Sequence, residues 1–135
     1  MGNRTVLPEG WRRPKGYSNA VVAQGCQIYV AGQVGWDSEE RFHSDDIAEQ
    51  AAQALRNVVA VLEAAGAGPE HIVRMTWYVT DKAAYIAGLK EIGQAYRDII
   101  GRNFPAMTAV EVTALVEDRA KVEIECTAVV DEGSG

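Results

Sequence analysis

The stretch that most constrains this chain is 121–130, in which apolar and polar side chains alternate strictly. Successive side chains of a strand point to opposite faces of a sheet. One face of this strand is wholly apolar and carries Val122, Ile124, Cys126, Ala128 and Val130. The other face carries two carboxylates, Glu123 and Glu125. The alternating stretch 107–114 is predicted to add Met107, Ala109 and Glu111 to that second face. The sequence therefore predicts a sheet with one apolar face and one mixed, acidic face.

Length and charge limit the class of protein. A chain of 135 residues is long enough for one domain with a sizeable core. The net charge of −6 opposes binding to nucleic acid or to an anionic membrane, so neither is expected as a partner. Residues 1–10 lack the apolar run of a signal peptide, and the two cysteines make no disulfide framework. A cytoplasmic location is therefore expected.

The remaining segments predict a mixed α+β domain. Residues 1–16 form a basic, extended arm, residues 17–130 a single domain, and residues 131–135 a disordered tail. Within the domain, the order β-β-α-β-α-β-β is predicted from a hairpin at 17–24 and 27–33, helices at 44–65 and 82–100, and strands at 71–80, 107–114 and 121–130. Ser44 and Asp81 are the predicted N-caps of the two helices. Two helices cover one face of such a sheet, so the other face is expected to be sealed by further copies of the chain.

Smaller features refine this picture. In the first helix, Gln50 and Asn57 are predicted to face water, away from the apolar stripe. The glycine-containing stretch 32–37 is either a tight turn or a loop that presents backbone N–H groups to a ligand. It lacks the Lys-Ser/Thr pair of a phosphate loop, and His43 and His71 lie outside any metal-ligand spacing. Neither a cofactor nor a metal ion is expected.

At this point the sequence resembles the Rid/YjgF family of small trimeric proteins. The similar stretches are 17–20 (YSNA), 31–37 (AGQVGWD), 64–67 (AAGA), 78–81 (YVTD), 104–106 (FPA), 110–112 (VEV) and 121–125 (KVEIE). The resemblance implies a chorismate-mutase-like subunit with two helices on one face of a mixed sheet. It also implies a homotrimer in which the sheets face inward and small molecules bind in clefts between subunits. The best-studied branch hydrolyses enamines and imines to 2-keto acids and ammonia.

The resemblance also implies site residues. Tyr17 and Glu125 correspond to the catalytic tyrosine and carboxylate, and Gly32 corresponds to the loop glycine at the cleft. The predicted substrate-binding residues are Gly32, Gln33, Val34, Trp77 and Met107. Met107 stands where deaminating members carry an arginine that clamps the substrate carboxylate, which a methionine cannot do. Arg12, Arg13, Lys90 and Arg102 are candidates for a substitute cation.

Three functions stay open on the sequence. The first is hydrolytic deamination of an enamine or imine, with specificity altered by Met107. The second is non-catalytic binding of a small metabolite between subunits. The third, RNA cleavage or translation inhibition, is disfavoured because the chain is acidic and has no basic, aromatic platform.

Overall fold

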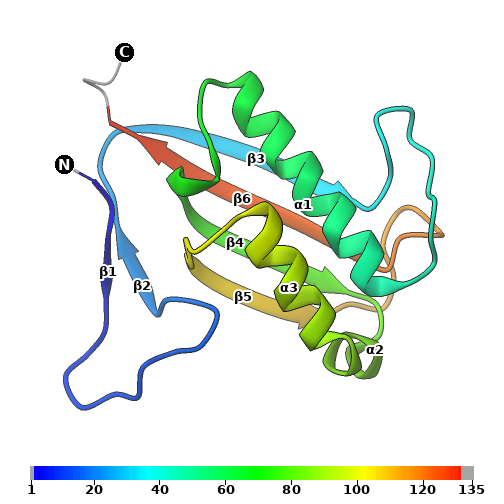
Figure 1. Cartoon of the computed structure of the whole chain (residues 1–135), viewed down its shortest axis with the longest axis horizontal. Coiled ribbons are helices and arrows are strands. Elements are labelled where there is room, and N and C mark those ends of the chain that lie inside the picture. Colours follow the sequence, from blue (N-terminus) through cyan, green and yellow to red (C-terminus); the bar gives the residue numbers. More distant parts are fainter. Residues whose placement is uncertain (1, 132–135) are drawn as a thin grey trace.

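A four-stranded mixed sheet with its helices on one face forms the body of the protein (Figure 1). The structure is a computed structural model and describes residues 2–131. The strands are β1 (Arg4–Val6), β2 (Ala20–Val22), β3 (Cys26–Val34), β4 (Ile72–Val79), β5 (Ala106–Glu111) and β6 (Val122–Val130). The helices are α1 (Ile47–Ala64), the 3-10 turn η1 (Pro69–His71), α2 (Lys82–Ala87) and α3 (Leu89–Ile99). The predicted α+β class is confirmed.

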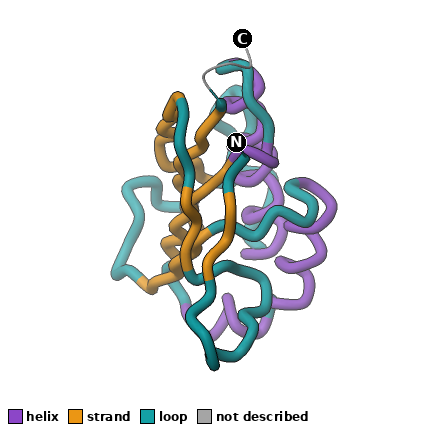
Figure 2. Tube along the Cα trace, turned by 90° about the vertical axis from the view of Figure 1, so that its left-hand side faces the viewer, coloured by secondary structure: helices purple, strands orange, loops and turns teal. Residues whose placement is uncertain are grey.

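The strand order of the main sheet is β3-β6-β4-β5. Strand β6 lies antiparallel between β3 and β4, whereas β5 is an edge strand parallel to β4. Parallel neighbours require a crossover connection, which α2 and α3 provide. Figure 2 shows the helices gathered on one side of the strands. Within residues 2–131, no helix lies against the other face of the sheet.

The core lies between β6, β4 and α1. The predicted apolar face of β6 is buried: Val122, Ile124 and Ala128 are 0% exposed and Cys126 is 5% exposed. Helix α1 packs Leu55, Val58 and Leu62 against it, all fully buried. Strict alternation in β6 thus meets the apolar stripe of an amphipathic helix, as the pattern predicts.

Helix α1 differs from its prediction at its start and in two polar residues. Asp46, and not Ser44, is the N-cap, because its side chain accepts a hydrogen bond from the Glu49 N–H at 3.0 Å. Gln50 is buried, and its amide bonds three backbone groups: the carbonyls of Ser44 and Arg119 and the N–H of Lys121. Asn57 is half-buried and donates to two carbonyls of the loop after β3. Both amides hold irregular backbone against the helix, so the prediction that they face water is wrong.

The predicted hairpin between 17–24 and 27–33 is also wrong. Strand β2 pairs antiparallel with β1 of the arm, and β3 pairs with β6. The Ser18 N–H donates to the Pro105 carbonyl at 2.9 Å, which holds this segment beside the start of β5. The arm is therefore partly strand, while its division from a domain at 17–130 stays a prediction. The predicted tail beyond Asp131 lies outside the described residues.

The predicted second helix at 82–100 is two helices. Asp81 caps α2 as predicted, accepting from the Ala84 N–H at 3.1 Å. Gly88 then ends α2, and its N–H bonds the carbonyls of Ala84 and Tyr85. Helix α3 starts at the next residue. A glycine in the middle of a helix is unfavourable, and here it marks the junction.

One row of β5 side chains lies on the opposite face of the sheet from the one predicted. This row consists of Met107, Ala109 and Glu111. The register pairs Met75 with Met107, Trp77 with Ala109 and Val79 with Glu111. Because Met75, Trp77 and Val79 are buried beneath the helices, Met107, Ala109 and Glu111 point to the helix side of the sheet. The edge strand β5 is half-buried or exposed along its length. Neither of its two rows of side chains is fully buried, so the sequence pattern does not show which row faces the helices. The mixed face instead consists mainly of residues from β4 and β6.

Candidate functional site

A pocket of about 380 Å³ opens on the helix side of the sheet, between β5, the α2–α3 pair and the arm. Its wall is largely apolar and aromatic, and is formed by Lys15, Gly16, Tyr17, Trp77, Tyr85, Leu89, Ile92, Gly93, Tyr96, Met107 and Ala109. Three of the predicted site residues, Tyr17, Trp77 and Met107, therefore lie around one cavity. Mostly apolar concavities with a few polar groups are typical of small-molecule sites.

The segment that follows the arm is fixed beside the start of β5 at Ser18. Its N–H bonds the Pro105 carbonyl, and its hydroxyl donates to the Phe104 carbonyl at 2.5 Å. Gly16, just before it, has a φ of +79°, a left-handed conformation that glycine adopts without steric cost. This turn places the neighbours of Gly16, Lys15 and Tyr17, along the pocket wall next to Met107.

Trp77 of β4 borders the pocket from the sheet. Only 2% of its surface is exposed, and its ring lies 6.3 Å from that of Tyr85, centroid to centroid. Among the described residues, the Trp77 Nε1–H has no hydrogen-bond partner, whereas buried donors are nearly always paired. Burial raises the pKa of the Tyr85 phenol above its ordinary value, so both aromatic groups are uncharged at neutral pH. Trp77 is thus a core residue that also borders a cavity.

Glu125 lies on the other face of the sheet. It borders a hollow of about 190 Å³ together with Tyr29, Arg74, Thr76 and Thr127. The Tyr78 hydroxyl donates to Glu125 Oε1 at 2.6 Å. This hydrogen bond stabilises the protonated phenol beside a carboxylate and so raises the pKa of Tyr78. Among residues 2–131, Tyr78 is the only partner of the Glu125 side chain, which leaves the second carboxylate oxygen available.

Gly32 lies on the same side of the sheet as the carboxylates. A Cβ at this position would come within 2.1 Å of Glu123 Oε2, so only glycine leaves that carboxylate where it is. Gln33 donates from Nε2 to the Ala31 carbonyl at 3.0 Å. The β3–β6 ladder shifts register between Val30 and Gln33, which marks a bulge in the strand. Bulges redirect the chain, here toward the loop that follows Val34.

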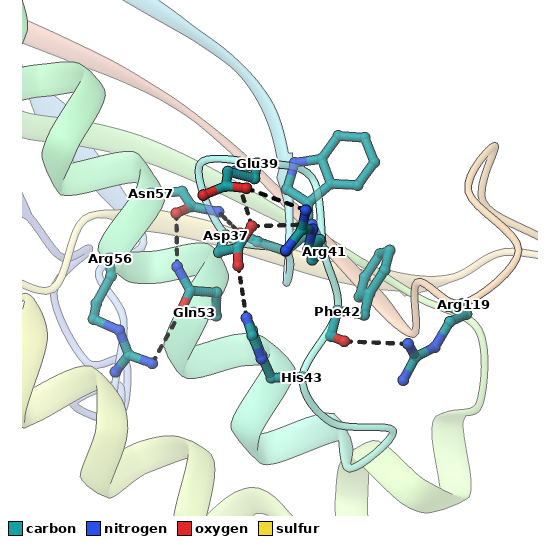
Figure 3. Close-up of polar contacts among 10 residues, drawn as sticks. Asp37, Glu39, Arg41, Phe42, His43, Gln53, Arg56, Asn57 and Arg119 are labelled. Carbon is teal, nitrogen blue, oxygen red and sulfur yellow. Dashed lines mark hydrogen bonds and ion pairs between the residues drawn. The ribbon is translucent and has the colours of Figure 1, made fainter.

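That loop is held by two polar clusters (Figure 3). Asn57 of α1 donates to the carbonyls of Val34 at 3.0 Å and Trp36 at 2.7 Å. Asp37 accepts hydrogen bonds from the backbone of Glu39 and Arg41 and contacts His43 Nε2 at 2.6 Å. These contacts, led by His43, lower the pKa of Asp37 to about 2. The stretch after Val34 is therefore a turn fixed by side-chain contacts, while a role of residues 32–37 in binding a ligand stays a prediction.

The predicted site residues fall into two groups. Tyr17, Trp77 and Met107 border the apolar pocket, whereas Glu125 and Gly32 lie on the opposite face of the sheet. The sequence reasoning did not single out Tyr78 or Lys15. The alternation of β4 places Tyr78 beside Thr76 and was a usable signal. The basic composition of the arm pointed to a cation for a binding site but not to Lys15 in particular, because the path of the arm cannot be read from its composition.

Other features have structural explanations. A hollow of about 530 Å³ is bordered by four acidic residues, but two of these, Asp46 and Asp81, cap helices. Burial raises the pKa of the Cys126 thiol to about 12, which disfavours the reactive thiolate. In the part of the chain that the structure describes, no group of three or more His, Cys, Asp or Glu could hold a metal ion. Nor does any helix within residues 2–131 have the length and apolar character needed to cross a membrane.

The fold defines the class: an α+β subunit of the Rid/YjgF type. The sequence pattern of the family described as Endoribonuclease L-PSP matches residues 12–130. The chain belongs to this family, which confirms the resemblance inferred from the sequence.

Relatives with assigned names support this membership. The human 2-iminobutanoate/2-iminopropanoate deaminase is 35% identical over 114 residues, which cover 84% of this chain and 79% of that protein. The Salmonella typhimurium deaminase of the same name is 35% identical over 80% of this chain and 83% of its own length. Among solved structures, a Rid-family protein of unknown function from Yersinia pestis, YyfB, has a TM-score of 0.86 and 32% identity. The match covers 96% of this chain and all of that one.

Proposed function

We propose that this protein is a hydrolytic deaminase for an enamine- or imine-type substrate, with a specificity altered by Met107. The observation that carries the proposal is the half-buried Glu125 carboxylate, oriented by Tyr78 at 2.6 Å in a hollow large enough for water. The names of the human and Salmonella relatives point to the same reaction class. The cytoplasmic location stays a prediction from the sequence.

The reaction needs one general base that later acts as an acid. Glu125 takes a proton from water as the water oxygen bonds to the imine carbon, the electron pair of the C=N π bond moves to nitrogen, and Glu125 passes its proton to that nitrogen. Glu125 then transfers the hydroxyl proton of the carbinolamine to its amino group, and the C–N bond breaks with its electron pair on the departing ammonia, which leaves a carbonyl product. An enamine first takes a proton on carbon to become the imine. One water is consumed for each ammonia released, and no redox partner is required.

The proposed site is completed by a neighbouring copy of the chain. Glu125 lies on β6, two strands from the edge strand that carries Met107, which is about 10 Å across the sheet. It also points to the opposite face, so one ligand cannot touch Glu125 and the apolar pocket of the same chain. A cyclic homotrimer with its sheets facing inward would bring the pocket of one subunit to the Glu125 face of the next. The uncovered face carries partly exposed apolar and aromatic residues, Val110 at 41% and Tyr29 at 73%, which favour such burial.

Tyr17 and the loop glycine complete the proposed chemistry. The Tyr17 hydroxyl, on a side chain 41% exposed at the pocket, serves as a hydrogen-bond donor to the substrate. Gly32 leaves room for the Glu123 carboxylate on the face of the sheet that carries Glu125. Trp77 and Met107 contact the apolar part of the substrate, while Gln33 and Val34 shape the strand end. A methionine offers no charge to a carboxylate, so a substrate bound as in the arginine-bearing relatives would bind weakly here.

The alternative is a non-catalytic trimer that binds a small metabolite, and Met107 is the residue that favours it. RNA cleavage, the activity in the family's description, receives less support. A net charge of −6 repels a polyanion, and the pocket offers one cation among its lining residues.

The test follows ammonia release from imines generated in place by an amino-acid oxidase. The wild type should release ammonia above the uncatalysed rate, and Glu125→Gln should lower the rate about 100-fold or more through loss of the general base. Glu70→Gln, at an exposed carboxylate of η1, is the matched control and should be unaffected. Background rates in the wild type, unchanged by Glu125→Gln, would favour the binding function instead.

A further inference from the structure

One charged side chain lines the apolar pocket, and its positive charge indicates which class of ligand the pocket can bind. Of the residues that line it, Lys15 is the only one with an ionisable group that is charged at neutral pH. No carboxylate lines the cavity to pair with it. None of the four cations expected from the sequence, at positions 12, 13, 90 and 102, borders this pocket.

The position of Lys15 is fixed by the backbone around it. Ser18, three residues on, is bonded to the carbonyls of Phe104 and Pro105 at the start of β5. Between them, Gly16 takes its left-handed φ of +79°, and Pro14 restricts the backbone on the other side. The ammonium group is therefore tethered beside the strand that carries Met107, on a stem long enough to reach a bound anion.

The rest of the cavity wall is mainly apolar or aromatic. Trp77, Ile92 and Met107 are half-buried or buried and belong to the core or pack against it. A ligand that complements this wall has an anionic group for Lys15 and an apolar body for the remaining residues. A volume of about 380 Å³ accommodates a body larger than a methyl or ethyl group.

We infer that Lys15 is a specificity-determining residue that binds the substrate carboxylate at the pocket mouth, and that the substrate class is 2-imino acids with a bulky apolar side chain. This inference rests on the proposed deaminase function and specifies its substrate. The carboxylate lies against Lys15, and the side chain of the substrate lies against Met107 and Trp77. Lysine binds as a point charge through one or two hydrogen bonds, which leaves the orientation to the apolar wall.

The test measures binding by calorimetry with stable 2-oxo acids, which share the carboxylate and the trigonal carbon of the imino acid. The full-length protein should bind 4-methyl-2-oxopentanoate about tenfold or more tightly than pyruvate, because its side chain buries three more carbon atoms. Lys15→Gln should weaken binding of the acid about tenfold, the effect of one lost charge-assisted hydrogen bond, and leave its methyl ester unchanged. Lys15→Arg should retain most of the affinity. Lys15 is exposed, so these variants keep the fold.

Two controls separate this inference from the proposed reaction. Arg12→Gln removes a nearby arm charge that does not border the pocket and should leave the affinity unchanged. Binding is read without turnover, so a protein that binds the acid through Lys15 but releases no ammonia supports the inference and contradicts only the deaminase. Equal affinity of wild type and Lys15→Gln for the acid, equal losses in Lys15→Gln and Arg12→Gln, or tighter binding of pyruvate would overturn it.

Discussion

At the scale of single residues, two side chains have roles that follow directly from their contacts. The Tyr78 hydroxyl orients Glu125. The Gln50 amide connects α1 to Ser44, before the helix, and to Lys121, far after it in the sequence. Neither role depends on the substrate, so both can be measured in the free protein.

The phenol of Tyr78 should report on Glu125. Its pKa is raised chiefly because its hydrogen bond to the Glu125 carboxylate favours the protonated phenol. Glu125→Gln replaces that anion with a neutral acceptor, so Tyr78 should ionise at a lower pH in the variant. An alkaline titration followed by phenolate absorbance measures this, and the difference from Tyr78→Phe isolates the one tyrosine. An unchanged titration would show that the two groups do not contact each other in solution.

Gln50 should matter for stability far more than a surface glutamine. Gln50→Met keeps the length of the side chain but leaves the carbonyls of Ser44 and Arg119 and the N–H of Lys121 without their partner. Buried groups left unpaired cost about 1–3 kcal/mol each in the free energy of unfolding, so a total loss of about 3 kcal/mol is expected. Denaturant unfolding measures the loss, with the exposed Gln94→Met as the matched control. A loss within about 0.5 kcal/mol, typical of surface substitutions, would contradict the buried network.

At the scale of elements, the loop after β3 should make stability depend on pH in the acid range. Folding lowers the pKa of Asp37 from 3.8 to about 2, through the contacts with His43, Arg41 and Glu39. A carboxyl with a lowered pKa in the folded state stabilises that state above its unfolded pKa and loses this contribution as the pH falls through its folded pKa. The Asp37 contribution is therefore complete above a pH of about 4 and is lost as the pH falls toward 2.

Denaturant midpoints across this pH range measure the effect. Asp37→Asn should be less stable than the wild type at neutral pH and should show a smaller decline on acidification. Asp45→Asn is the comparison variant, because Asp45 is an exposed carboxylate in the segment just before α1. Parallel pH profiles for the wild type and Asp37→Asn would contradict the role given to Asp37.

The sequence predicts best those helices and strands whose hydrophobic pattern fits only one structure. The alternation of β6 and the stripe of α1 were assigned correctly because one face of each is buried entirely. The row of Met107 and Ala109 was assigned to the wrong face, since an edge strand leaves both rows partly exposed. The hairpin failed because the partner of β2 lies in the arm, and strand pairing across the chain leaves no local signal. Gln50 was placed in water because glutamine is mostly exposed in proteins, and its burial follows from contacts with residues distant in the sequence.

The candidate site shows the same division. Tyr17, Met107 and Trp77 were assigned to one cleft, and they border one pocket. Their separation from Glu125 follows from the side of the sheet on which β5 presents Met107, which the sequence did not give correctly. Lys15 could not be assigned because its place depends on the Ser18 contacts with residues 104 and 105.

At the scale of the whole molecule, one helix layer covers one face of the sheet, and no helix of residues 2–131 covers the face that carries Glu125 (Figures 1 and 2). The central claim is that each site combines the pocket of one chain with the Glu125 of another. Two variants isolate these halves: Glu125→Gln removes the base, and Ala109→Trp fills the pocket with an indole at an exposed position of β5. Each variant alone should be inactive.

The most direct measurement is the ammonia-releasing activity of the two inactive variants after they are mixed, dissociated and reassembled. If the halves of a site come from different chains, about a quarter of the sites in a random mixture combine an open pocket with an intact Glu125, and activity returns in that proportion. If a mixture reassembled to the size of the wild type stays as inactive as its components while the wild type is active, both halves belong to one chain. That result would contradict the account.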